Sequence, residues 1–365
     1  MTALILGSDG DPSRLVHAAP PWTDARTAPG SLTVQPADKG FDGQFFYRIA
    51  VSPLTSRRSV AGVRFDLPAL RNARWLYGSM AWTVSGGDRD VVPWALIALN
   101  LAAAAVAGGL SGALARDSGR HALWGLLLAL YPGFAYSLSL DTSELVAATF
   151  LLAALLALRR RRWALAAATL TLAVLTRDTA VVVAVGVVVA PVWARLRSRT
   201  EARHLGPFLA GAVPIAIFGL WQLLQRARFG AWPLTSSGDN NLAAPFRGLA
   251  HELGRSLPPT SGAQIFRLLS IVVLMSVAVG AAFTLRRSGA PLAEKLAWVP
   301  AVLVVVLLNA YLWSGATAFM RAGTEAYLLS ALILLGGPVR ASILSAVPVG
   351  GLWTITAAAQ VAKAR

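Results

Sequence analysis

The dominant feature of the sequence is a succession of apolar runs that starts near residue 91 and continues almost to the C-terminus. Runs of this length are typical of helices that cross a bilayer and satisfy their own backbone hydrogen bonds. Composition agrees, since 56% of the residues are hydrophobic and only 14% are charged. We therefore predict an all-α, polytopic transmembrane helical bundle. Its ten apolar segments are 91–114, 121–139, 143–158, 163–176, 179–193, 206–224, 266–285, 296–312, 323–337 and 341–358.

The apolar stretch 163–193 is interrupted by Arg177 and Asp178. A single helix over this stretch would measure roughly 46 Å, too long for one crossing. It would also place the arginine clusters at 159–162 and 195–203 on opposite faces, against the positive-inside rule. We therefore predict two short helices, with the turn between them recessed within the membrane profile and facing protein or water.

The basic residues of the short loops predict the orientation. Fourteen Arg and Lys residues follow the first, third, fifth, seventh and ninth segments, whereas the short loops of the other face carry only Arg177 and Arg321. The fourteen are therefore assigned to the cytoplasm. The formal net charge of +16 is explained by these topology signals, and no motif of a nucleic-acid-binding protein accompanies it. We expect a multi-pass protein of the inner (plasma) membrane whose active face is extracytoplasmic.

Residues 1–90 contain no apolar run long enough to span a bilayer. They are predicted to form an extracytoplasmic first loop, in which 66–82 reads as an amphipathic helix in the membrane interface. The transmembrane domain is predicted at 91–358, including an outer loop at 225–265, followed by a tail at 359–365. An exported polar segment needs a route across the membrane, so we expect one further transmembrane helix before Met1 and a chain truncated at its start.

The first loop contains the cluster Phe41-Asp42-Gly43-Gln44-Phe45-Phe46-Tyr47-Arg48. Its aromatic residues suit the level of the lipid headgroups, and Asp42 next to a flexible glycine can reach into a cavity. Asp42 is either the N-cap of an interfacial helix or a general base.

Three further groups of polar residues border the predicted outer face. Asp141 and Glu144 open an apolar helix, as a capping box or as side chains of a site. Arg177 and Asp178 either form a structural ion pair or provide a phosphate ligand, because arginine grips phosphate with two nitrogens. Arg321 and Glu325 allow the same two interpretations.

Several activities are excluded by missing residues and motifs. The chain has no cysteine and only four histidines, which excludes disulfides and thiolate chemistry and disfavours a zinc site built by the protein. No P-loop, nucleophile elbow or dinucleotide-binding fingerprint is present.

Taken together, four motifs resemble bacterial integral membrane glycosyltransferases of the GT-C superfamily, from an uncharacterised branch with an Asp-Gly-Gln-Phe-type first-loop motif. The likeness extends from about residue 10 to residue 182. One departure is Asp178, where a glutamate is expected after the arginine. The motifs are 42–48, Tyr131-Pro132-Gly133-Phe134, 141–144 and Leu175-Thr176-Arg177-Asp178-Thr179.

The resemblance implies transfer of a sugar from a polyprenyl-phosphate donor to an acceptor hydroxyl at the outer face, usually with inversion. Asp42 matches the position of the catalytic base, and Asp141 or Glu144 would orient the acceptor or a divalent metal ion. The carboxylates are too scattered in the sequence to indicate which metal ion, if any, would bind. A flippase or transporter for a lipid-linked sugar or another amphiphile is the main alternative, although we see one broken helix and no internal repeat. A membrane scaffold is the third. The candidate substrate-binding residues are Gln44, Tyr47, Arg48, Arg177, Asp178 and Arg321.

Overall fold

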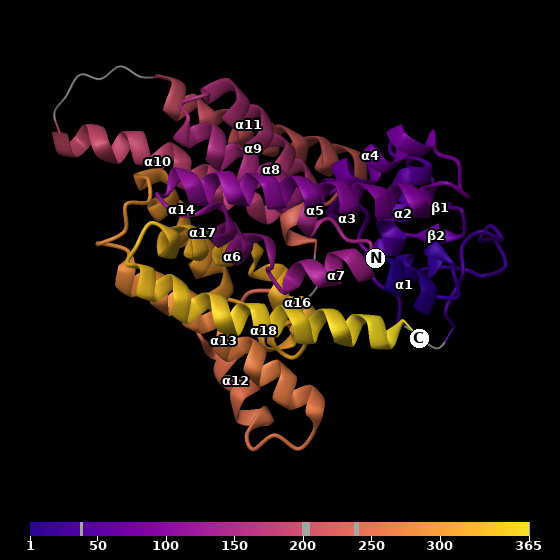
Figure 1. Cartoon of the computed structure of the whole chain (residues 1–365). Helices are drawn as coiled ribbons and strands as arrows, with labels where there is room; N and C mark the ends of the chain where they lie inside the picture. The colour runs from indigo at the N-terminus through magenta and orange to yellow at the C-terminus, as the bar shows by residue number, and fades with distance from the viewer. Residues whose placement is uncertain (37–38, 199–204, 237–240, 365) are drawn as a thin grey trace.

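The computed structural model describes residues 1–36, 39–198, 205–236 and 241–364, and these form an almost entirely helical bundle (Figure 1). The described strands, β1 (Ser59–Val60) and β2 (Val63–Arg64), form one short antiparallel pair. Arg199 and Arg203, which belong to the predicted cytoplasmic charges, lie outside the described residues, as does part of the predicted outer loop at 225–265.

The helices fall into an N-terminal group and a bundle that contains the long apolar helices. The N-terminal group comprises α1 (Thr2–Gly7), η1 (Pro12–Val16), α2 (Gly43–Val51), α3 (Pro68–Ala73) and α4 (Trp75–Ser85). The first half of the bundle comprises α5 (Val92–Asp117), η2 (Ala122–Gly125), α6 (Leu126–Ala129), α7 (Gly133–Ser139), α8 (Glu144–Arg159), α9 (Trp163–Thr176), η3 (Asp178–Ala180) and α10 (Val181–Ser198). The second half comprises α11 (Leu205–Phe229), η4 (Pro233–Thr235), α12 (Arg247–Ser256), α13 (Gly262–Thr284), α14 (Leu292–Val306), α15 (Ala310–Trp313), α16 (Ala316–Ala322), α17 (Thr324–Leu335) and α18 (Val339–Lys363).

Among the described residues, five helices are long and apolar enough to cross a membrane, or up to seven if each of two bent helix pairs is one span. The helical membrane bundle is therefore supported, but the predicted count of ten crossing segments is not confirmed. Each predicted segment does contain helix. Several of these helices are short, and α8, α9 and α14 have 16, 14 and 15 residues.

Helices α8 and α17 are largely enclosed by neighbouring helices. Both sequences are apolar on every side, and a helix without a polar face is stable only when neighbours surround it. All twelve residues of α17 are buried. Helix α8 packs between α5 and α9, while α13 and α14 pack against α17. Each of these two central helices begins near a glutamate, Glu144 in α8 and Glu325 in α17.

The far end of α8 carries a different buried ion pair. Arg159 donates from Nε and Nη2 to the two carboxylate oxygens of Glu294, at 2.6 and 2.8 Å. Arg159 also donates to the backbone oxygen of Leu114 and to the hydroxyl of Ser118. One arginine of the predicted topology cluster therefore joins α8, α14 and α5 rather than facing solvent.

The predicted interruption at Arg177 is confirmed. Helix α9 ends at Thr176, Arg177 is extended with φ −151° and ψ 118°, and η3 leads into α10. The expectation of one broken helix was wrong, because the segment 121–139 is bent by 66° between its two parts and α16 is bent by 61° against α17. These breaks create helix ends inside the bundle.

The N-terminal group covers one end of the bundle, where the indigo segment lies beside the end of α18 (Figure 1). The prediction of one interfacial helix over 66–82 was wrong, because the chain breaks at Arg74 into α3 and α4. The break has a structural reason, since α4 packs against α2 and α5 while α3 packs against α11. It also turns the side chain of Arg74 toward the helix ends within the bundle.

Candidate functional site

Asp42 immediately precedes α2 but does not cap it, because its side chain makes no hydrogen bond to the helix amides. The next residue, Gly43, brings this helix start against the bundle. A Cβ atom at Gly43 would lie 2.6 Å from the backbone oxygens of both Leu140 and Val16, so any larger residue would push α2 away. The glycine of the first-loop motif thus allows Asp42 to approach the bundle.

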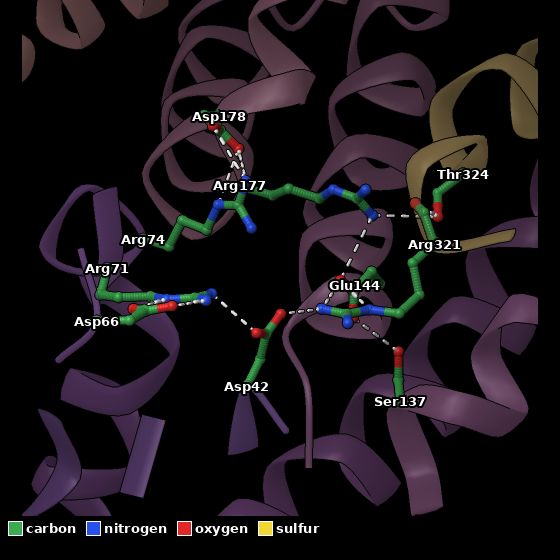
Figure 2. A network of polar contacts seen from close by, with 10 residues as sticks. All are labelled: Asp42, Asp66, Arg71, Arg74, Ser137, Glu144, Arg177, Asp178, Arg321 and Thr324. Carbon is green, nitrogen blue, oxygen red and sulfur yellow. Dashed lines mark hydrogen bonds and ion pairs between the residues drawn. The ribbon is translucent and has the colours of Figure 1, made fainter. Parts of the chain in front are cut away.

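The carboxylate of Asp42 lies between two arginines from distant parts of the chain (Figure 2). Oδ1 accepts from Nη1 of Arg71 at 2.8 Å, and Oδ2 accepts from Nη2 of Arg321 at 2.6 Å. Arg71 also donates from Nε and Nη2 to both oxygens of Asp66, at 2.8 and 2.7 Å. Asp42 therefore connects the first loop to α16.

The second part of the network surrounds Glu144 at the start of α8. Its Oε1 accepts from Nε of Arg321 at 2.8 Å and lies 3.9 Å from Nη1 of Arg177. Arg177 also lies 3.6 Å from Glu325 and donates to the hydroxyl of Thr324 at 3.2 Å. The predicted pairing of Arg321 with Glu325 is therefore replaced by contacts between different segments.

Asp178 joins the network through a residue of the first loop. Arg74 donates from Nε and Nη2 to the two oxygens of Asp178, at 3.0 and 3.2 Å. Asp178 thus pairs with Arg74, whereas its sequence neighbour Arg177 contacts α8 and α17. Arg177 and Glu144, which the sequence placed on the same outer face, thus lie close together, whereas Asp178 contacts Arg74 of the first loop.

The charges of this network follow the polarity of the helix ends. Asp42, Glu144, Asp178 and Glu325 lie at the beginnings of α2, α8, η3 and α17, where the helix dipole favours negative charge. The arginines lie at the opposite kind of end: Arg71 and Arg321 are in the last turns of α3 and α16, and Arg74 and Arg177 directly follow α3 and α9. Converging helix ends therefore explain how so many charges share one buried region.

The environment of Asp42 keeps its carboxyl ionised. Burial raises its pKa, but the charges of Arg71 and Arg321 outweigh burial and hold the pKa well below its usual range. The side chain retains 21% exposure, compared with 17% for Arg71 and 11% for Arg321. Asp42 is thus a partly accessible carboxylate between two guanidinium groups.

Asp141 does not join the network. It is fully buried in the turn before α8 with a positive φ of 45°, and neither carboxyl oxygen has a hydrogen-bond partner among the described residues. Burial raises the pKa of Asp141 well above its usual range, because a carboxylate loses its hydration when it is buried. Asp141 therefore makes no hydrogen bond to the arginines of the network.

Three candidates from the first-loop motif have contacts inside the N-terminal group instead. Gln44 accepts from the hydroxyl of Thr23 at 2.8 Å, and the hydroxyl of Tyr47 donates to the backbone of Arg89 at 3.3 Å. Arg48 lies over the ring of Phe65 with 3.6 Å to its centroid. Gln44, Tyr47 and Arg48 are all at most 2% exposed, so in this structure they hold the first loop together.

A cavity of about 740 Å³, lined by both polar and apolar side chains, lies next to the network. The shared wall is Phe41, whose ring lies 4.9 Å from the guanidinium carbon of Arg321. The lining of the cavity also includes His17, Gln35, Ser139 and Gln360. The hydroxyl of Ser139 donates a hydrogen bond to the side-chain oxygen of Gln360 at 3.0 Å. Amides, hydroxyls and an aromatic ring therefore line a cavity that reaches Phe41, the residue before Asp42.

Sequence reasoning placed Arg71 and Arg74 on an interfacial helix and did not assign them, or Asp66, to the site. In the sequence, Asp66, Arg71 and Arg74 appear only as an acidic residue followed by two arginines. The same pattern occurs in ordinary solvent-exposed turns, so it does not indicate a site. Thr324 and Ser137 were missed as well, although Ser137 contacts Glu144 at 3.4 Å. Identifying these residues requires knowledge of the tertiary contacts.

The carboxylates of the network face guanidinium groups, and within the described residues no three Asp, Glu or His side chains are grouped as a metal site would need. Comparison of the chain with protein-family models, with curated proteins and with solved structures gave no match.

Proposed function

We propose that the chain is a membrane glycosyltransferase that transfers a sugar from a polyprenyl-phosphate donor to an acceptor hydroxyl at the extracytoplasmic face, with inversion. The observation that carries the proposal is the position of Asp42. Its carboxylate does not cap α2 and lies between Arg71 and Arg321 where the first loop meets the bundle.

The reaction needs a proton acceptor and a cationic partner for the leaving group. The acceptor oxygen attacks the anomeric carbon, the bond from that carbon to the phosphate oxygen breaks, and the phosphate leaves with the electron pair. Asp42 takes the proton of the attacking hydroxyl as general base. Arg321 and its neighbours stabilise the charge that develops on the departing phosphate.

The surroundings suit both substrates. The apolar outer faces of the bundle, with exposed residues such as Phe283 and Leu344, are suited to contact lipid, from which a polyprenyl donor would approach. The cavity next to Phe41 provides hydroxyl, amide and aromatic groups, which can contact a sugar. We place the acceptor there, since Phe41 directly precedes Asp42 in the chain.

The direct test is to incubate the purified protein in lipid nanodiscs with a panel of polyprenyl-phosphate sugars and candidate acceptors. We expect release of polyprenyl phosphate together with a glycosylated product. The bent helices also fit a flippase or transporter, so a parallel measurement in proteoliposomes should follow translocation of a labelled lipid-linked sugar. Translocation without transfer would contradict the proposed function and support the alternative.

The proposed sidedness predicts a labelling pattern. Arg160→Cys, at an exposed position after α8, should react with an impermeant maleimide only after the cells are permeabilised, because the basic cluster is assigned to the cytoplasm. Arg58→Cys, exposed in the first loop, is the matched control and should react in intact cells. The chain has no cysteine of its own, so the background is low. Labelling of position 160 in intact cells would contradict the proposed orientation in the membrane.

A further inference from the structure

We infer that Arg71 and Arg321 form a phosphate-binding site that the carboxylate of Asp42 occupies in this structure, as an anion tethered to the chain. An incoming lipid phosphate would take over the two guanidinium groups and release Asp42 to act on the acceptor. This inference rests on the proposed function but concerns how the same site is regulated, and it requires the donor to bind before the acceptor can react.

Both arginines are held by other groups and do not need Asp42 to keep their positions. Arg71 is gripped by both oxygens of Asp66 and lies 4.3 Å from the centroid of the Phe45 ring. Arg321 donates to Glu144 at 2.8 Å and lies against the ring of Phe41. A carboxylate and an aromatic face thus orient each guanidinium group. Such a preorganised pair of cations would remain after Asp42 moves away.

Asp42 is the more weakly held component. It offers one oxygen to each arginine, so neither contact is bidentate. Its side chain makes no capping bond and, at 21%, is the most exposed of the three. Rotation about its own side-chain bonds would therefore move the carboxylate without moving α2 or either arginine.

A phosphate has the chemistry to replace this carboxylate. It presents more acceptor oxygens and can engage both arginines with stronger, charge-assisted bonds. Asp42 would then lose two cationic neighbours and gain an anionic one. Both changes raise the pKa of its carboxyl from a value well below the usual range, where it is a weak base. Donor binding would thereby increase the basicity of the Asp42 carboxylate next to the bound donor.

The test measures binding alone, with farnesyl phosphate as the probe and protein in nanodiscs. Asp42→Asn should bind the probe more tightly than the wild type, by roughly threefold to thirtyfold, because the competing anion is gone. Arg71→Gln and Arg321→Gln should bind it more weakly. Asp117→Asn, which alters a carboxylate paired with Arg160 at the other end of α8, is the matched control and should leave the affinity unchanged.

Equal or weaker binding by Asp42→Asn would overturn the inference. If that variant does not fold, Asp42→Ser removes the same charge with a smaller side chain and should show the same tightening. The result is independent of catalysis. Tighter binding by Asp42→Asn, together with no sugar transfer by the wild type, would support the anion site and contradict the glycosyltransferase. Sugar transfer by the wild type, together with unchanged affinity in Asp42→Asn, would contradict only the replacement of Asp42 by the lipid phosphate.

Discussion

Replacing Asp42 by asparagine should lower sugar transfer by about 10² to 10⁴ while the protein still folds and inserts. Asparagine has nearly the same size and can still accept a hydrogen bond from one of the two arginines through its amide oxygen, but it cannot take a proton at neutral pH. Loss of general-base assistance typically has an effect of about this size. The measurement is the single-turnover rate with saturating donor, which separates the chemical step from binding.

The matched control is Asp9→Asn. Asp9 is another carboxylate of the first loop and is paired with Arg14 at 2.7 Å, but the side chain of Asp9 is 82% exposed. Exposed pairs of this kind contribute little, so transfer and melting temperature should stay near the wild-type values. Near-normal turnover by Asp42→Asn would place the base elsewhere. Glu144 would then be the next residue to test, because it shares Arg321 with Asp42.

Arg321→Gln should have the second large effect, and it should affect both stability and activity. Arg321 contacts Asp42 and Glu144 and is only 11% exposed. Removing one partner from a buried ionic group typically costs about 3–5 kcal/mol, because the remaining charges lose their compensation. Loss of one preorganised donor to the leaving phosphate should also reduce kcat/KM for the donor by roughly 10² to 10³.

Two variants separate these contributions. Arg321→Lys keeps the charge but cannot contact Asp42 and Glu144 with a planar fork, so it should recover more stability than activity. Arg160→Gln changes an exposed arginine of a weaker pair, 3.3 Å from Asp117, and should leave both quantities nearly unchanged. Thermal unfolding in nanodiscs and initial rates at several donor concentrations provide the two readouts. If Arg321→Lys had normal donor kinetics, a positive charge alone would suffice at this position.

The fold class and several site residues followed from local patterns. Hydropathy located the helices, and the charged pair at 177–178 located a break, because an uninterrupted helix there would be too long for one crossing. The same patterns overestimated the number of crossing segments, since an apolar run does not reveal whether its helix is long, short or bent. The helix expected over 66–82 is split at Arg74, because its two halves pack against different helices, and a local sequence pattern does not show these packing partners.

The sequence by itself determined that this chain forms apolar helices and that Asp42, Glu144, Arg177, Asp178 and Arg321 lie near helix ends. These properties depend on hydropathy and helix length, which act over neighbouring residues. The tertiary structure alone decided the partners. Asp42 contacts Arg71 and Arg321, 29 and 279 residues away, while Asp178 pairs with Arg74, 104 residues away. Charges of opposite sign attract without regard to sequence distance, so their pairing is settled only when the packing of α2, α3, α8 and α16 brings particular helix ends together.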